Sequence, residues 1–125
     1  MAKRIMVIDD SQEILELMAM ILADEGYDPI LSITVTQDLT PIKQARPDLI
    51  ILDYMLGGAG GSDLLSKLQQ DGDTAPIPII ICSAAIRQLQ DMADQLAAQG
   101  VVVVYKPFDV DHLLATVQHV LRERD

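Results

Sequence analysis

Short apolar runs alternate along this chain with longer segments in which apolar positions recur at helical spacing. The runs without a polar residue occupy 5–8, 49–52, 79–82 and 101–104. Strands of a parallel sheet that is covered on both faces have this unbroken apolar character. The pattern therefore predicts strand and helix units that repeat on a parallel sheet.

A fifth strand is expected at 27–33, so the sheet has five strands, each followed by a helix. The predicted helices are a segment with a stripe from Ile14 to Leu22 that ends at Gly26, then 36–45, 62–70, 86–98, and a last helix that Asp109 opens. Pro41 lies inside the second of these segments. Because Pro is tolerated in a first helical turn, that helix is expected to begin nearer Leu39 or Thr40.

Composition narrows the class of protein. The 125 residues fit one domain, expected to span 1–125, and the 50% apolar content is enough for a buried core. The 19 acidic and 9 basic residues give a net charge of −10, which opposes sequence-independent binding to nucleic acid or anionic lipid. With one Cys, no stretch that could cross a bilayer and no signal-peptide pattern, we expect a soluble cytoplasmic domain.

Polar side chains follow four of the predicted strands closely. In strand order they are Asp9 with Asp10, then Asp53, Ser83 and Lys106. Crossovers between parallel strands are right-handed, and ligands of open α/β sheets gather at the carboxyl ends of the strands. We therefore expect these residues to meet at one edge of the sheet, although they lie far apart in the sequence.

The chemistry of this set points to a divalent cation and to phosphoryl transfer. Carboxylates 5 Å apart repel each other by about 3 kcal/mol per pair at an effective dielectric of about 20, so the acidic residues need a cation or protons. Carboxylate oxygens suit Mg²⁺, whereas a structural zinc site would need a Cys and His cluster. A lysine and a hydroxyl opposite a metal-bound carboxylate supply what phosphoryl transfer to that carboxylate requires. Asp53 is the candidate nucleophile.

The order of these motifs resembles that of the response regulator receiver domains of two-component signalling. The motifs are Asp9-Asp10, Asp53, Ser83-Ala84 and Lys106-Pro107-Phe108. The resemblance covers the full length of the chain. It implies a flavodoxin-like, doubly wound α/β fold, a three-layer sandwich around a parallel five-stranded sheet with strand order 2-1-3-4-5.

The resemblance also implies a role for each acidic residue. Asp53 would accept a phosphoryl group from a phosphohistidine on a histidine kinase or a histidine phosphotransfer protein. Mg²⁺ would be bound by the carboxylates of Asp10 and Asp53, by the backbone carbonyl of Met55, and by Asp9 through water. The domain would act as an enzyme only on itself, in its own phosphorylation and dephosphorylation.

Ser83 would hydrogen-bond one phosphoryl oxygen after activation, and Lys106 would ion-pair with another. The peptide between Lys106 and Pro107 is typically cis in this family. Phosphorylation would switch binding of a downstream protein target at the face of the fourth helix, fifth strand and fifth helix, where the family also forms homodimers. The chain resembles a stand-alone receiver, with no direct contact to nucleic acid or membrane.

Two positions depart from the family pattern. The family's proline four residues after the phosphoacceptor is Gly57 here, within a glycine-rich stretch whose last residue, Gly61, matches a family glycine. The family's aromatic residue three positions before the lysine is Val103. Tyr105 is expected on the same strand face as Val103, which makes it a candidate replacement. If Tyr105 does not replace it, the signal must pass through another element.

Other interpretations stay open at this point. Asp10 alone could cap the first helix, with Glu13 completing a capping box. Cys82 is expected to be a buried apolar residue and not a redox group. A receiver-like interaction module that is never phosphorylated would share the fold. An aspartyl-phosphate hydrolase of the haloacid dehalogenase type would need an acid at Met55, and a flavodoxin-like electron carrier would need a hydroxyl-rich loop after the first strand.

Overall fold

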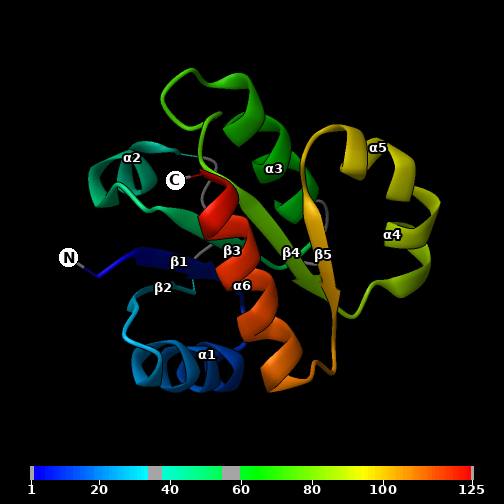
Figure 1. The fold of residues 1–125 in the computed structure, drawn as a ribbon. Coiled ribbons are helices and arrows are strands. Elements are labelled where there is room, and N and C mark those ends of the chain that lie inside the picture. The colour runs from blue at the N-terminus through cyan, green and yellow to red at the C-terminus, as the bar shows by residue number, and fades with distance from the viewer. Residues whose placement is uncertain (1, 34–37, 55–59, 125) are drawn as a thin grey trace.

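The computed structural model describes residues 2–33, 38–54 and 60–124, and its centre is a five-stranded sheet between two layers of helices (Figure 1). The strands are Arg4–Ile8 (β1), Asp28–Ser32 (β2), Leu49–Leu52 (β3), Ile79–Ser83 (β4) and Val102–Tyr105 (β5). They pair in parallel in the order β2-β1-β3-β4-β5. The predicted fold class and strand order are confirmed.

Helices cover both faces of the sheet. They are Gln12–Asp24 (α1), Thr40–Ala45 (α2), Gly60–Gln70 (α3), Ile86–Asp91 (α4), Ala93–Ala98 (α5) and Val110–Arg124 (α6). The buried residues of α1 and α6 pack on one face, and those of α2, α3, α4 and α5 pack on the other. None of the described helices is long and apolar enough to cross a membrane.

The sequence prediction of one helix over 86–98 is wrong, because this segment forms two short helices separated at Met92. The backbone there has φ −104° and ψ 8°, and the Met92 amide donates to the carbonyl of Leu89, three residues earlier. Leu89 and Leu96 still pack in the same core cluster on either side of the break. The apolar periodicity therefore continues across Met92, which is why the pattern alone predicted a single helix.

The strand interiors explain the unbroken apolar runs of the sequence. Ile50 and Leu52 belong to the core cluster on the α3 side of the sheet, whereas Leu49 and Ile51 belong to the cluster on the α1 side. Because successive strand residues point to opposite faces, a sheet covered on both faces needs an apolar residue at every position. Each such side chain contributes about 1.5–3 kcal/mol on burial, so this sheet forms a rigid platform for the residues at its edge.

Candidate functional site

The residues predicted from the sequence meet at the carboxyl edge of the sheet. Asp9 follows β1, Asp53 follows β3, Ser83 is the last residue of β4, and Lys106 follows β5. Backbone hydrogen bonds hold these strand ends together: the amide of Asp53 donates to Ile8 at 3.0 Å, and the amide of Lys106 donates to Ser83 at 2.9 Å. The prediction that these residues meet at one edge of the sheet is therefore confirmed.

The acidic residues form one cluster. Asp9, Asp10 and Asp53 each place a carboxylate oxygen within 4.8 Å of the others. Asp9 and Asp53 are 3% and 8% exposed, and Asp10 is exposed to solvent. Carboxylates at this spacing repel one another, and two of them lie away from bulk water, so the cluster favours a bound cation. The predicted backbone ligand Met55 and the loop residue Gly57 lie outside the described residues.

Lys106 lies between the two buried carboxylates. Its Nζ is 2.6 Å from Oδ2 of Asp9 and 3.3 Å from Oδ2 of Asp53. Burial disfavours the charged amine, but the hydrogen bond to Asp9 and the charges of Asp53 and Asp9 outweigh this effect and raise the pKa of Lys106 above its ordinary value. The peptide between Lys106 and Pro107 is cis, as expected.

Asp9 and Ser11 form the start of α1, so the interpretation of Asp10 as a helix cap is wrong. Ser11 is the N-cap, and its Oγ accepts from the amide of Ile14 at 3.4 Å. Oδ1 of Asp9 accepts from the amide of Ser11 at 2.9 Å, while its other oxygen contacts Lys106. Asp9 is therefore fixed at both oxygens, and Asp10 takes no part in the cap.

Ser83 lies at the end of β4 and is fully buried. Its Oγ accepts from the amide of Ala85 at 3.2 Å, which holds the start of the loop toward α4. A hydroxyl that accepts one hydrogen bond can still donate its own proton to an acceptor such as a phosphoryl oxygen. The burial of Ser83 means that such an acceptor would have to enter the site deeply.

Gly61 positions the backbone of Asp53. A Cβ at Gly61 would lie 2.4 Å from the carbonyl oxygen of Tyr54 and 2.5 Å from that of Asp53. The first turn of α3 can therefore contact the chain after β3 only because residue 61 has no side chain.

Gly61→Ala is expected to lower the free energy of unfolding by about 2–3 kcal/mol, because backbone atoms must move to admit the methyl group. Gly72→Ala is the matched control, since a Cβ at Gly72 would meet nothing within 4 Å, and its effect should stay within about 0.5 kcal/mol. Urea denaturation measures both variants. Equal stabilities of the two would contradict the packing role of Gly61.

Cys82 is a core residue, as its place in an apolar run predicts. It is 2% exposed, and burial raises the pKa of its thiol to about 11. At pH 8 only about one thiol in a thousand would be ionised, so Cys82 should react with an aromatic disulfide reagent only after unfolding. Fast stoichiometric reaction of the native protein at pH 8 would show that the thiol is accessible.

An apolar groove borders the site between α1 and the start of α6. Leu17 and Val110 on its walls are 39% and 41% exposed, and they join the other apolar residues of the groove in one contiguous surface. The groove is lined by Ile14, Leu17, Ala84, Lys106, Pro107, Phe108 and Val110. Lys106 lines this groove and also contacts Asp9 and Asp53, so the apolar surface continues directly into the acidic cluster.

Comparison with known proteins agrees with this geometry. The DNA-binding response regulator MtrA of Mycobacterium tuberculosis is 34% identical over the whole chain, and PhoB, the phosphate regulon transcriptional regulatory protein of Escherichia coli, is 29% identical over 98% of it. The chain spans about half the length of these relatives, 53% of each. The receiver domain of the Francisella response regulator 1452 superposes with a TM-score of 0.83 at 23% identity, covering 98% of this chain and 99% of that one. Residues 5–118 match the response regulator receiver domain family, to which this chain therefore belongs.

Proposed function

We propose that Asp53 is the phosphoacceptor of this receiver domain and takes its phosphoryl group from a phosphohistidine of a partner protein in the presence of Mg²⁺. The observation that supports this most is the environment of Asp53. Its carboxylate is buried, lies next to two other acidic groups, and is 3.3 Å from a lysine that also holds Asp9. Transfer to this carboxylate needs positive charge around the incoming oxygens, and Lys106 supplies part of it.

The reaction is a phosphoryl exchange between a nitrogen and an oxygen. A carboxylate oxygen of Asp53 attacks phosphorus, the P–N bond to the donor imidazole breaks, and a P–O bond forms. The electron pair of the broken bond stays with the imidazole nitrogen, which takes up a proton if it leaves as an anion. The product is an acyl phosphate on Asp53. Its oxygens would accept from the Lys106 amine, which lies 3.3 Å from the carboxylate, and from the hydroxyl of Ser83 at the end of the neighbouring strand β4.

The residues that would hold Mg²⁺ are Asp9, Asp10 and Asp53. Their carboxylate oxygens have the hard character that Mg²⁺ prefers, and their spacing within 4.8 Å fits a shared ion. The chemistry that a bound ion supplies is positive charge beside the transferring phosphoryl oxygens. Lys106 offsets part of the negative charge of the same carboxylates when the ion is absent.

The groove beside the site offers a docking surface for the phosphohistidine donor. Its exposed apolar residues Leu17 and Val110 lie around the same opening that contains Lys106. A donor helix that buried these side chains would bring its imidazole to the acidic edge of the sheet. The same proposal includes a downstream protein target and a homodimer at the face of α4 and α5, β5 and α6, which correspond to the predicted fourth helix, fifth strand and fifth helix. It also includes the role of Val103, which stands where the family has an aromatic residue. The partners are proposals because the chain spans about half the length of its curated relatives.

Intact-protein mass spectrometry tests the proposal. The protein is incubated with acetyl phosphate, or with phosphoramidate, which carries a P–N bond like that of phosphohistidine, with and without Mg²⁺. We expect a gain of one phosphoryl group that requires Mg²⁺ and disappears on treatment with hydroxylamine, which cleaves acyl phosphates. If the folded protein gains no phosphoryl group with either donor, the domain is an interaction module that is not phosphorylated.

A further inference from the structure

Besides the core packing of Leu89 and Leu96, the α4 and α5 segment makes a single side-chain hydrogen bond to the rest of the protein, within the part of the chain that the structure describes. Oη of Tyr54 donates to Sδ of Met92 at 3.2 Å. Met92 is the residue at which the two helices separate. The hydrogen bond is therefore made at the residue where the helical segment is interrupted.

The two helices are weak elements by themselves. Each has six residues, and neither N-cap residue, Ala85 for α4 and Met92 for α5, makes a side-chain capping bond. Each helix buries one residue, Leu89 in α4 and Leu96 in α5. Short helices without caps depend on tertiary contacts for their stability, so the contact at Met92 carries more weight than it would in a long helix.

Tyr54 is well placed to sense the state of Asp53. It is the next residue in the chain, and Gly61 of α3 packs against the carbonyl oxygens of both residues. The ring of Tyr54 packs against the same core cluster as Met92. The tight contact with α3 leaves the backbone at Asp53 and Tyr54 little room to absorb a displacement, so a shift of the chain at Asp53 would be passed to the Tyr54 ring.

We propose that the Tyr54 to Met92 hydrogen bond couples the phosphorylation state of Asp53 to the α4 and α5 segment. This inference rests on the proposed function of Asp53. A contact that is equally strong in both states transmits nothing, so a coupling bond must differ between them. The structure contains this bond. In our proposal, phosphorylation of Asp53 weakens it and loosens the segment at Met92 for a partner.

Coupling of this kind is reciprocal: if phosphorylation weakens the bond, loss of the bond favours the phosphorylated-like state. The direction of the change in affinity for a phosphoryl mimic can therefore be predicted. If phosphorylation costs the protein this bond, a variant without the bond reaches the phosphorylated-like state more easily. Tyr54→Phe removes only the hydroxyl. Its affinity for beryllium fluoride, a mimic of the phosphoryl group, in the presence of Mg²⁺ is expected to be about two- to fivefold higher than that of wild type. This is the lower part of the range that one neutral hydrogen bond supplies, because a thioether sulfur is a weak acceptor.

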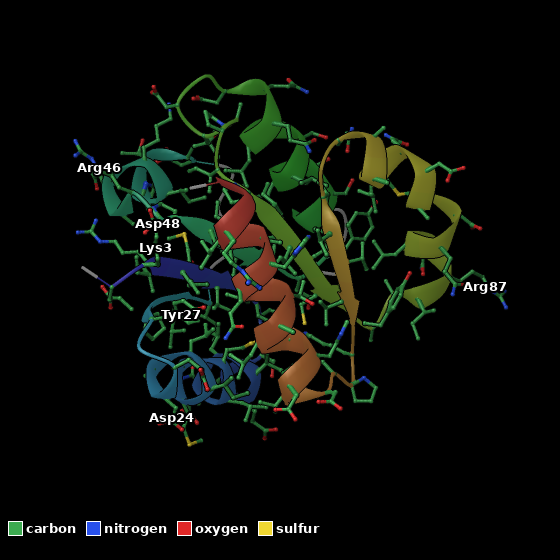
Figure 2. All side chains as sticks on the ribbon, viewed as in Figure 1. Lys3, Asp24, Tyr27, Arg46, Asp48 and Arg87 are labelled. Atoms are coloured by element: carbon green, nitrogen blue, oxygen red, sulfur yellow. The ribbon has the colours of Figure 1, made fainter. Side chains whose placement is uncertain are left out.

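The test combines three measurements on wild type, Tyr54→Phe, Met92→Leu and Tyr27→Phe. Mass spectrometry with acetyl phosphate records phosphorylation, titration records beryllium fluoride affinity, and hydrogen exchange records the protection of peptides that cover 86–98. Met92→Leu removes the acceptor at nearly constant volume and gives an answer even if Tyr54→Phe folds poorly. Tyr27 is the matched control, because it packs in the cluster on the α1 side, on the other face of the sheet from α4 (Figure 2).

The coupling predicts that wild type loses protection over 86–98 when beryllium fluoride binds. Without the mimic, hydrogen exchange over 86–98 should already be about two- to fivefold faster in Tyr54→Phe and Met92→Leu than in wild type. Tyr27→Phe should exchange at the wild-type rate. Wild-type affinity and protection in both variants, with normal phosphorylation, would overturn the coupling alone. If wild type gains no phosphoryl group at all, the proposed function is overturned, and the coupling is overturned with it.

Discussion

Asp53→Asn is expected to abolish the gain of a phosphoryl group completely, with every donor and at every Mg²⁺ concentration. The amide nitrogen and oxygen of Asn are poor nucleophiles, and the variant cannot form an acyl phosphate. Intact mass spectrometry in parallel with wild type measures the effect. A phosphoryl gain in the variant that is still removed by hydroxylamine would mean that another carboxylate is the acceptor.

The same substitution should leave the fold intact. Asp53 is one of three carboxylates within 4.8 Å of one another, and Lys106 keeps its closer contact, the 2.6 Å bond to Asp9. Removing one charge relieves repulsion, so the melting temperature in buffer without Mg²⁺ should equal or exceed that of wild type. A melting temperature far below wild type would show that Asp53 is needed for structure, and the loss of phosphorylation could then not be assigned to chemistry.

Lys106→Ala is expected to be the most destabilising change at the site. The amine is the cation that the structure places between two carboxylates that are 3% and 8% exposed. Removing one partner of a buried charge cluster leaves the others uncompensated, which costs about 3 kcal/mol. In buffer without Mg²⁺, this corresponds to a drop in melting temperature on the order of 10 °C for a domain of this size.

Mg²⁺ should recover much of this loss, because a cation bound by the same carboxylates replaces the missing charge and stabilises the folded state by mass action. The difference in melting temperature between Lys106→Ala and wild type is therefore expected to shrink as the Mg²⁺ concentration rises. Phosphorylation-dependent switching of partner binding should stay impaired in the variant. Thermal denaturation at increasing Mg²⁺ concentrations measures this, with Ca²⁺-free buffers throughout. A gap that is independent of Mg²⁺ would contradict a shared cation site.

The sheet could be predicted from the sequence because burial on both faces requires an apolar residue at every strand position. Runs such as 49–52 and 79–82 are apolar without interruption, and the polar residues that follow them lie at the edge where the site forms. The meeting of these residues at one edge could be predicted without any distances. They are Asp9, Asp53, Ser83 and Lys106. Parallel strands place their carboxyl ends together whatever the loop lengths between them.

The details that the sequence could not provide depend on contacts between side chains of different elements. The break at Met92 leaves the apolar period intact, and Tyr54 differs from an ordinary half-buried aromatic only through its bond to that residue. Ser11 and Asp10 are both good capping residues, and only the backbone geometry decides that Ser11 is the cap. The sequence near Met92, Tyr54 and Ser11 therefore contains no local pattern from which these features could be predicted.

Chemical trapping of the acyl phosphate tests the central claim most directly. Borohydride reduces an aspartyl phosphate to homoserine, which marks the phosphorylated position permanently and can be found by peptide mass spectrometry. After incubation with acetyl phosphate and Mg²⁺, we predict homoserine at position 53 and unmodified aspartate at positions 9 and 10. Homoserine at either of those positions, or at none while the protein carries phosphate, would contradict the assignment of Asp53 as the phosphoacceptor.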